Sequence, residues 1–126
     1  MQADYEAGTF SVIDRASTLP ADFDGNSQCA DLHVSRDGRF AYVSNRGHNS
    51  IAVFSVSPSG DLELLQTEST QGEWPRNFMI TPDGNWLLVA NQYSNNIAVF
   101  RVNPQTGQLS YTGEEVEVFS PTCLAI

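Results

Sequence analysis

Short apolar segments separated by polar turns run along most of this chain of 126 residues. The pattern predicts four strands over residues 31–35, 40–45, 51–56 and 61–68. An Asp-Gly pair at 37–38 and the sequence Ser-Pro-Ser-Gly at 57–60 are turn signals between these segments. No segment shows the period of about 3.6 residues that is typical of helices. The pattern therefore predicts antiparallel strands joined by tight turns.

The same four segments recur about 46 residues later, an internal repeat in the sense used for repeat proteins. Residues 78–102 align without a gap with residues 32–56. Asp83-Gly84 falls over Asp37-Gly38, and the sequence Ile-Ala-Val-Phe occurs in both copies. The second set of predicted strands is 77–81, 86–91, 97–102 and 108–119. A period of roughly 40–50 residues filled with short strands is typical of β-propeller blades.

The repeats divide the chain into four parts. Residues 29–75 and 76–120 are predicted to form one complete blade each. Residues 1–28 match the outer strand of a preceding blade followed by a loop, and residues 121–126 match 75–80, the inner strand of a further blade. We expect an all-β fold with antiparallel four-stranded blades, two complete and the rest partial. Open strand edges at both ends favour pairing with further blades, either in a longer protein or in a homo-oligomer that closes the ring.

Charge and composition exclude several kinds of partner. The formal net charge of −9 repels phosphate backbones, which argues against nucleic acid. No apolar run approaches the length that a membrane span needs, and the first residues lack the pattern of a signal peptide. Cys29 and Cys123 have no zinc-binding spacing, so we expect no metal. Two reduced thiols without a signal peptide suit the cytoplasm.

Polar and aromatic residues gather in the loops that are expected on one rim, residues 45–49, 73–77 and 91–95. Arg46 and His48 lie in the first of these loops, where the second repeat has Gln92 and Ser94. Arg76 stands where an inner strand begins, beside the central channel of a propeller. Its guanidinium could bind a carboxylate or phosphate, or could bridge neighbouring blades. Trp74 could line a pocket or pack between blades.

Two titratable residues lie in phase on the first predicted inner strand. Asp31 occupies the position of Asn77, and His33 occupies that of Met79. Either could take a proton from a water molecule. The structural alternatives are a carboxylate that caps a loop amide and a core histidine with a satisfied ring. The chain lacks the Gly-x-Ser-x-Gly sequence, a phosphate-binding loop and a dinucleotide fingerprint. The residues therefore favour water activation and anion binding over covalent catalysis.

Three runs of sequence carry a family resemblance: CADLHVSRDGRF at 29–40, YVSNRGHNSIAVF at 42–54 and WPRNFMITPDGNWLLVANQYSNNIAVF at 74–100. They resemble the bacterial lactonase family of seven-bladed propellers, which includes propeller-type 6-phosphogluconolactonases and relatives of carboxymuconate cyclase. The resemblance implies a cytoplasmic carbohydrate-metabolising hydrolase that opens a small anionic sugar lactone with water and without a cofactor. About five blades of such a propeller are absent from this chain.

The resemblance also implies roles for the residues named above. His33 and Asp31 are the catalytic candidates; the substrate-binding candidates are Arg46, His48, Arg76, Asn77 and Gln92. Two alternatives stay open. The chain could act as a non-catalytic, self-assembling or binding module that uses the same rim. It could also belong to a lactone cyclase of the carboxymuconate type, because formation and opening of a lactone share a transition state.

Overall fold

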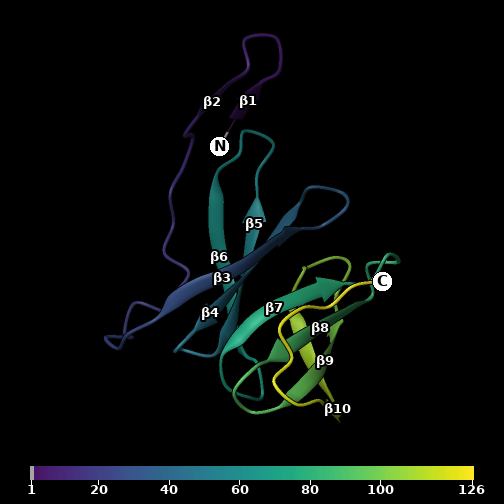
Figure 1. Ribbon diagram of the computed structural model, residues 1–126. Coiled ribbons are helices and arrows are strands. Elements are labelled where there is room, and N and C mark those ends of the chain that lie inside the picture. The colour runs from purple at the N-terminus through teal and green to yellow at the C-terminus, as the bar shows by residue number, and fades with distance from the viewer. Residues whose placement is uncertain (1) are drawn as a thin grey trace.

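The computed structural model describes residues 2–126 as two four-stranded antiparallel sheets and a short N-terminal hairpin (Figure 1). The hairpin pairs β1 (Gln2–Asp4) with β2 (Thr9–Ser11). The first sheet has the order β3 (Gln28–Val34), β4 (Phe40–Arg46), β5 (Ser50–Val56) and β6 (Leu62–Ser69). The second has the order β7 (Pro75–Ile80), β8 (Trp86–Asn91), β9 (Asn96–Val102) and β10 (Leu109–Glu117). The expected all-β class with four-stranded antiparallel repeats is confirmed.

The inner strands begin earlier than the sequence pattern predicts. In the pairing of β3 with β4, Cys29 lies opposite Asn45 and Leu32 opposite Val43, so one extra residue is accommodated between them. The pairing of β7 with β8 shifts in the same way between Pro75 and Asn77. Such bulges interrupt the alternation of inward and outward side chains. The apolar pattern therefore marks only the part of each strand that follows the bulge.

The two ends of the chain carry little regular structure. Residues 2–27 contain two short strands, β1 and β2, and the sequence pattern predicted an outer strand and a loop in this part. Residues 121–126 form no strand, because no second strand of that blade is present to pair with them. They lie beside β7, where the Leu124 amide donates to Asn77 Oδ1 at 2.7 Å (Figure 1). No helix that could cross a membrane occurs within residues 2–126.

Alternation along the strands produces two apolar clusters. The larger one fills the space between the sheets, and its buried members include Tyr42 and Ile51 of the first sheet and Phe78, Leu87 and Phe100 of the second. Residues on the opposite face of the first sheet form the smaller cluster, which contains Ala41, Val43, Ala52 and Phe54. Because neighbouring residues of a strand point to opposite faces, β4 contributes to both clusters. The first sheet is thus packed on both sides.

Side-chain hydrogen bonds tie the two sheets together away from the apolar core. The buried Tyr42 hydroxyl donates to the Gly107 carbonyl at 2.7 Å. The Gln66 side chain on β6 accepts from the Leu109 amide at 2.8 Å and donates to the Leu109 carbonyl at 3.0 Å. The Gln66 side-chain amide therefore forms the pair of hydrogen bonds that the backbone of a neighbouring strand would form with Leu109. This pair links β6 and β10, the outer strands of the two sheets.

The connecting loops gather at one end of the molecule. Asn49, in the loop between β4 and β5, accepts from the Trp74 amide at 2.9 Å through Oδ1. Asn95, in the equivalent loop of the second sheet, accepts from the Ser120 amide at 2.9 Å. The Asp-Gly turns lie at the other end, where the Arg39 guanidinium donates to the Pro104 carbonyl at 2.8 Å. We call the first end the mouth, made by the loops 45–49, 71–74 and 91–95.

Candidate functional site

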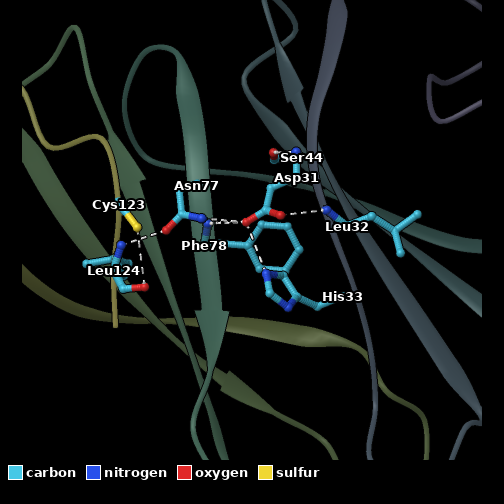
Figure 2. Close-up of polar contacts among 8 residues, drawn as sticks. All are labelled: Asp31, Leu32, His33, Ser44, Asn77, Phe78, Cys123 and Leu124. Atoms are coloured by element: carbon cyan, nitrogen blue, oxygen red, sulfur yellow. Dashed lines mark hydrogen bonds and ion pairs between the residues drawn. The ribbon is translucent and has the colours of Figure 1, made fainter. Parts of the chain in front are cut away.

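Asp31 of β3 and Asn77 of β7 meet where the two inner strands lie side by side (Figure 2). Asp31 Oδ2 accepts from Asn77 Nδ2 at 2.7 Å, from the Phe78 amide at 3.2 Å and from His33 Nε2 at 3.0 Å. The bulge in β3 removes the Asp31 amide from the strand ladder, and it donates instead to Ser44 Oγ at 3.0 Å. Backbone and side chain of Asp31 are therefore both fixed.

The hydrogen bonds suit Asp31 to orienting His33 rather than to accepting a proton. Its second oxygen, Oδ1, accepts from the Leu32 amide at 2.9 Å, so both carboxylate oxygens are occupied by donors. A histidine that donates from Nε2 to a carboxylate carries its lone pair on Nδ1. No residue within 2–126 bonds to His33 Nδ1. The imidazole thus has the arrangement of a general base held by a carboxylate.

His33 is accessible as well as oriented. Its side chain is 41% exposed, against 23% for Asp31. The ring lies edge-on to Phe78 with the centroids 4.8 Å apart. A groove of about 310 Å³ begins at His33 and runs between β3 and β7, past Met79 to Arg36 and Pro82 at the Asp-Gly turns, the end opposite the mouth. A ligand in this groove would reach the imidazole directly.

Asp31, Asn77 and Cys123 occupy one repeat position in three successive inner segments. Asp31 accepts a hydrogen bond from the Phe78 amide, and Asn77 accepts one from the equivalent Leu124 amide at 2.7 Å (Figure 2). The side chains of Asp31 and Asn77 therefore each hold the next inner segment in place. The sequence contained the signal for this arrangement, because aligning residues 121–126 with 75–80 places Cys123 over Asn77.

Arg46 ends β4 at the mouth, and several contacts fix its position. Its Nη2 donates to the Cys29 carbonyl at 3.1 Å, and its guanidinium lies 5.3 Å from the centre of the Trp74 ring. Arg46 Nε is buried and has no hydrogen-bond partner. The backbone is held by the Ser27 hydroxyl, which donates to the Arg46 carbonyl at 2.9 Å. Gly47, with φ of 102°, allows this approach, since a Cβ there would collide with the Asn26 carbonyl.

Trp74 has an unusual backbone conformation for a bulky residue. Its φ of 65° lies in the left-handed region, which costs a side chain of this size on the order of 1 kcal/mol or more. The indole ring is stacked on Tyr93 with centroids 4.9 Å apart and an interplanar angle of 13°. The equivalent residue of the second repeat is Ser120, with φ of 46°. The left-handed position is thus common to both repeats, whereas the indole ring is not.

A second guanidinium lies at the same end. Arg76 is exposed, and its Nη1 donates to Gln92 Oε1 at 3.3 Å. Gln92 is the repeat equivalent of Arg46, so each sheet presents one guanidinium at the mouth, but from a different strand. The chain has six cationic residues and a net charge of −9. Arg46 and Arg76 therefore place two guanidinium groups at the mouth.

His48 is separated from the other candidate residues. Its Nδ1 bonds to Ser50 Oγ at 2.7 Å, and its ring packs edge-on against Phe23 with centroids 4.6 Å apart. The structure therefore brings together Asp31, His33 and Asn77 on the inner strands, and it brings together Arg76 and Gln92 at the mouth. Arg46 joins the mouth through Trp74 and Cys29. Within residues 2–126, no group of three or more His, Cys, Asp or Glu residues could hold a metal ion.

Sequence reasoning did not find the contact of Trp74 with Arg46 or its stacking on Tyr93. The loops that hold Arg46, Trp74 and Tyr93 lie far apart in the sequence, and only the fold brings them together. A signal was nevertheless present. Arg46 and Trp74 both fall at positions where the two repeats differ, and such positions favour a specialised role for one loop.

The chain is similar to two proteins that are named as lactonases and to a third protein from Lactobacillus plantarum. It is 43% identical over 119 residues to the 6-phosphogluconolactonase of Bacillus subtilis (strain 168), covering 94% of this chain and 34% of that protein. The crystal structure of a protein from Lactobacillus plantarum superposes with a TM-score of 0.94 and 36% identity, over 97% of this chain and 36% of that one. The periplasmic gluconolactonase PpgL of Pseudomonas aeruginosa gives a TM-score of 0.81 and 44% identity, over 85% and 30% respectively.

These alignments place the two sheets as blades of a larger ring. The chain spans about a third of the length of the relatives that it matches. The family model that describes "Lactonase, 7-bladed beta-propeller" matches residues 1–126. The resemblance seen in the sequence is thereby confirmed, and the chain belongs to the lactonase family of seven-bladed β-propellers.

Proposed function

We propose that the protein containing this chain hydrolyses a sugar lactone with a water molecule that His33 activates. The observation that carries this proposal is the pair formed by Asp31 and His33 on an inner strand, with the Nδ1 atom of His33 free and a groove beside it. The names of relatives support the same chemistry, because those from Bacillus subtilis and Pseudomonas aeruginosa are both called lactonases.

In the proposed reaction, His33 acts as general base and Asp31 as its positioning residue. The Nδ1 atom takes a proton from water while the water oxygen bonds to the carbonyl carbon of the lactone. The imidazolium that forms is stabilised by the Asp31 carboxylate, which accepts a hydrogen bond from Nε2 at 3.0 Å. Asn77 and the Phe78 amide keep this carboxylate in place from the neighbouring blade.

Ring opening follows from the tetrahedral intermediate. The electrons on its oxygen re-form the carbonyl, the bond from carbon to the ring oxygen breaks, and His33 returns its proton to that oxygen. The product is the open hydroxy acid, so lactone and water account for all atoms. Arg46 and Arg76 supply positive charge at the mouth, and a substrate with an anionic group would be drawn towards them. Gln92 holds Arg76 through its hydrogen bond.

The test uses the full-length gene product that carries this sequence and a sugar lactone as substrate. We expect His33→Asn to lower kcat by about 10²–10⁴-fold, the range of general base catalysis, without unfolding the protein. We expect Asp31→Asn, which installs the residue of the second repeat, to lower kcat by about tenfold or more and to alter the pH dependence of the rate. Unchanged kinetics for both variants would refute the proposal.

The second histidine of the chain provides a matched comparison. His48→Asn makes the same chemical change at a ring that faces Ser50 and Phe23 instead of Asp31. A loss as large as that of His33→Asn would contradict the assignment of His33 as the base. Thermal unfolding of each variant separates a catalytic loss from a loss of fold.

A further inference from the structure

Ser44 of β4 lies opposite the bulge of β3, beside the pair formed by Asp31 and His33. Its Oγ accepts a hydrogen bond from the Asp31 amide at 3.0 Å, the amide that the bulge removes from the strand ladder (Figure 2). Ser44 is fully buried and does not line the groove at His33. Its hydroxyl therefore contacts the backbone of the candidate site from behind, where a substrate does not reach.

The second repeat shows that packing does not require a hydroxyl at this position. Ala90 is the equivalent of Ser44, is also fully buried, and lies opposite Asn77 at the bulge of β7. A bulge of the same kind thus forms opposite an alanine. A buried hydroxyl costs free energy unless a hydrogen bond compensates for it. At Ser44 the bond from the Asp31 amide provides this compensation, and alanine cannot form it.

The serine occurs together with the two titratable residues of the inner strand. The first repeat has Ser44, Asp31 and His33. The equivalent residues of the second repeat are Ala90, Asn77 and Met79. Of the two sheets, only the one whose inner strand carries a carboxylate bonded to an imidazole ring has the buried hydroxyl behind it. This association indicates that the hydroxyl serves the carboxylate and the ring.

The bond to Ser44 fixes the backbone from which the Asp31 carboxylate extends. One carboxylate oxygen accepts from the Leu32 amide at 2.9 Å and the other from His33 Nε2 at 3.0 Å. Because Leu32 directly follows Asp31, the direction of the carboxylate depends on the local backbone. Without the Ser44 hydroxyl the Asp31 amide loses its acceptor, and the backbone of the bulge would rotate towards another one. The His33 ring would then lose the partner that selects its tautomer.

We infer that Ser44 is a positioning residue of the hydrolysis, which acts through the Asp31 amide on the orientation and the tautomer of His33. This inference rests on the proposed function and adds to it a residue that touches neither the substrate nor the imidazole ring. Since Ser44 lies behind the inner strand, its effect falls on the chemical step and not on substrate binding.

The kinetic test uses the full-length gene product and a sugar lactone. We expect Ser44→Ala to lower kcat about threefold to tenfold and to leave KM within about twofold, because only the orientation of the base changes. The pH dependence of kcat should change in the same direction as in Asp31→Asn. Combined with Asp31→Asn, Ser44→Ala should cause no further loss of kcat, since Ser44 acts through Asp31.

Ser50→Ala is the matched control. Ser50 is a buried serine of the same sheet, but its hydroxyl bonds to His48 Nδ1 at 2.7 Å. The control should leave kcat and its pH dependence unaltered. If Ser44→Ala is unfolded, Ser44→Cys replaces it, since a thiol is a weaker acceptor than a hydroxyl. An unchanged kcat in the Ser44 variant, a loss that adds to that of Asp31→Asn, or an equal loss in Ser50→Ala would overturn the inference.

A spectroscopic measurement separates this inference from the proposed function. The ¹⁵N shifts of the His33 ring, assigned by their loss in His33→Asn, report which nitrogen carries the proton of the neutral ring. We expect the form protonated on Nε2 in the unaltered protein, because Nε2 bonds to the Asp31 carboxylate. Ser44→Ala should show a mixture of both tautomers, whereas Ser50→Ala should not. An unchanged tautomer in Ser44→Ala refutes the positioning role. Absence of lactone hydrolysis by the unaltered protein refutes the proposed function instead.

Discussion

The two sheets carry the same apolar pattern but bury it to different extents. Tyr42 and Ile51 of the first sheet are buried, whereas their repeat equivalents in the second sheet, Leu88 and Ile97, are half-buried. Phe40 is 8% exposed and its equivalent Trp86 is 37% exposed. The difference arises because the second sheet covers the first, while no further sheet among residues 2–126 covers the corresponding face of the second.

This comparison separates the residues that pack a blade from the residues that form the candidate site. The apolar positions and the loop asparagines are alike in both repeats, because every blade must pack against its neighbours. The inner strand and the mouth are different: His33 stands over Met79, and Arg46 over Gln92. Positions that are alike in the two repeats therefore serve the packing of the blades. Positions that differ beside the channel are the candidates for a role in binding or catalysis. Each prediction below tests one pair of equivalent residues.

The largest effect is expected for the equivalent phenylalanines Phe54 and Phe100. Phe100 is fully buried in the core between the sheets, and its removal by Phe100→Ala should cost about 3–5 kcal/mol of stability. Phe54 lies in the smaller cluster on the far face, so Phe54→Ala should cost at least about 1 kcal/mol less. Urea unfolding measures both. Equal losses would show that the far face is packed as tightly as the core.

Tyr42 differs from its equivalent Leu88 in having a hydroxyl, which bonds to Gly107. Tyr42→Phe leaves that buried carbonyl without its donor and should cost about 1–2 kcal/mol.

The same group predicts a dependence on alkaline pH. Burial, with a smaller effect of the Asp37 charge, raises the pKa of Tyr42 to about 12. Because the folded pKa exceeds the ordinary value of 10, the contribution of the neutral phenol is complete below pH 10 and is lost as the pH rises through 12. Unfolding curves between these pH values should show a smaller decline for Tyr42→Phe than for the unaltered chain. Parallel declines would contradict the prediction.

Asn49 and Asn95 share a φ of 57°, but they accept different numbers of bonds through Oδ1. Asn95 accepts from Ser120, whereas Asn49 accepts from both Trp74 and Gly47, the latter at 3.2 Å. Replacement by alanine should cost about 1 kcal/mol at either position, since alanine tolerates the left-handed region less well and cannot accept the bond. Thermal unfolding should rank Asn49→Ala as the more damaging. The opposite order would show that the number of hydrogen bonds accepted by Oδ1 does not determine the loss of stability.

The smallest effect concerns the Asp-Gly turns. The Ser35 hydroxyl, followed by the Arg39 guanidinium, lowers the pKa of Asp37 from 3.8 to about 2. A depressed pKa means that the stabilisation is present above pH 4 and is lost as the pH falls through 2. Asp37→Asn should therefore reduce the acid dependence of unfolding in that range. The pKa of Asp83 is also lowered, chiefly by the Thr81 hydroxyl. If neither Asp37→Asn nor Asp83→Asn alters the acid limb of the urea midpoint, the turns contribute nothing to it.

The repeat made most of the fold predictable. Strand β8 has the bounds that the pattern predicts, and β4, β5 and β9 differ by a single residue. These strands lie in the middle of their sheets, where apolar side chains on both faces define them. The inner strands were less predictable, because a bulge shifts the register between Cys29 and Leu32 in β3 and between Pro75 and Asn77 in β7. Such a bulge leaves no signature in an apolar pattern, since the equivalent residues within it are Ala30 in one repeat and Arg76 in the other.

The candidate site was predictable only where it follows the strand period. Asp31 and His33 are two residues apart on one strand, so their side chains were expected on the same face, and they bond to each other. His48 was grouped with Arg46 by proximity in the loop, yet its ring turns to Ser50 and Phe23. Trp74 reaches Arg46 only because the loop before β7 crosses the mouth in a left-handed conformation. Loop contacts of this kind depend on the packed blades and not on local sequence.

The bond pair between Gln66 and Leu109 has a consequence for aggregation. An outer strand offers unpaired amide and carbonyl groups to which a strand of another molecule can add. At Leu109 both groups are already occupied by the side-chain amide of Gln66, so a foreign strand has to displace an intramolecular partner before it can begin to pair there. Gln66 thus hinders strand addition at the start of β10, and its deamidation to glutamate would remove the donor and leave the Leu109 carbonyl open again.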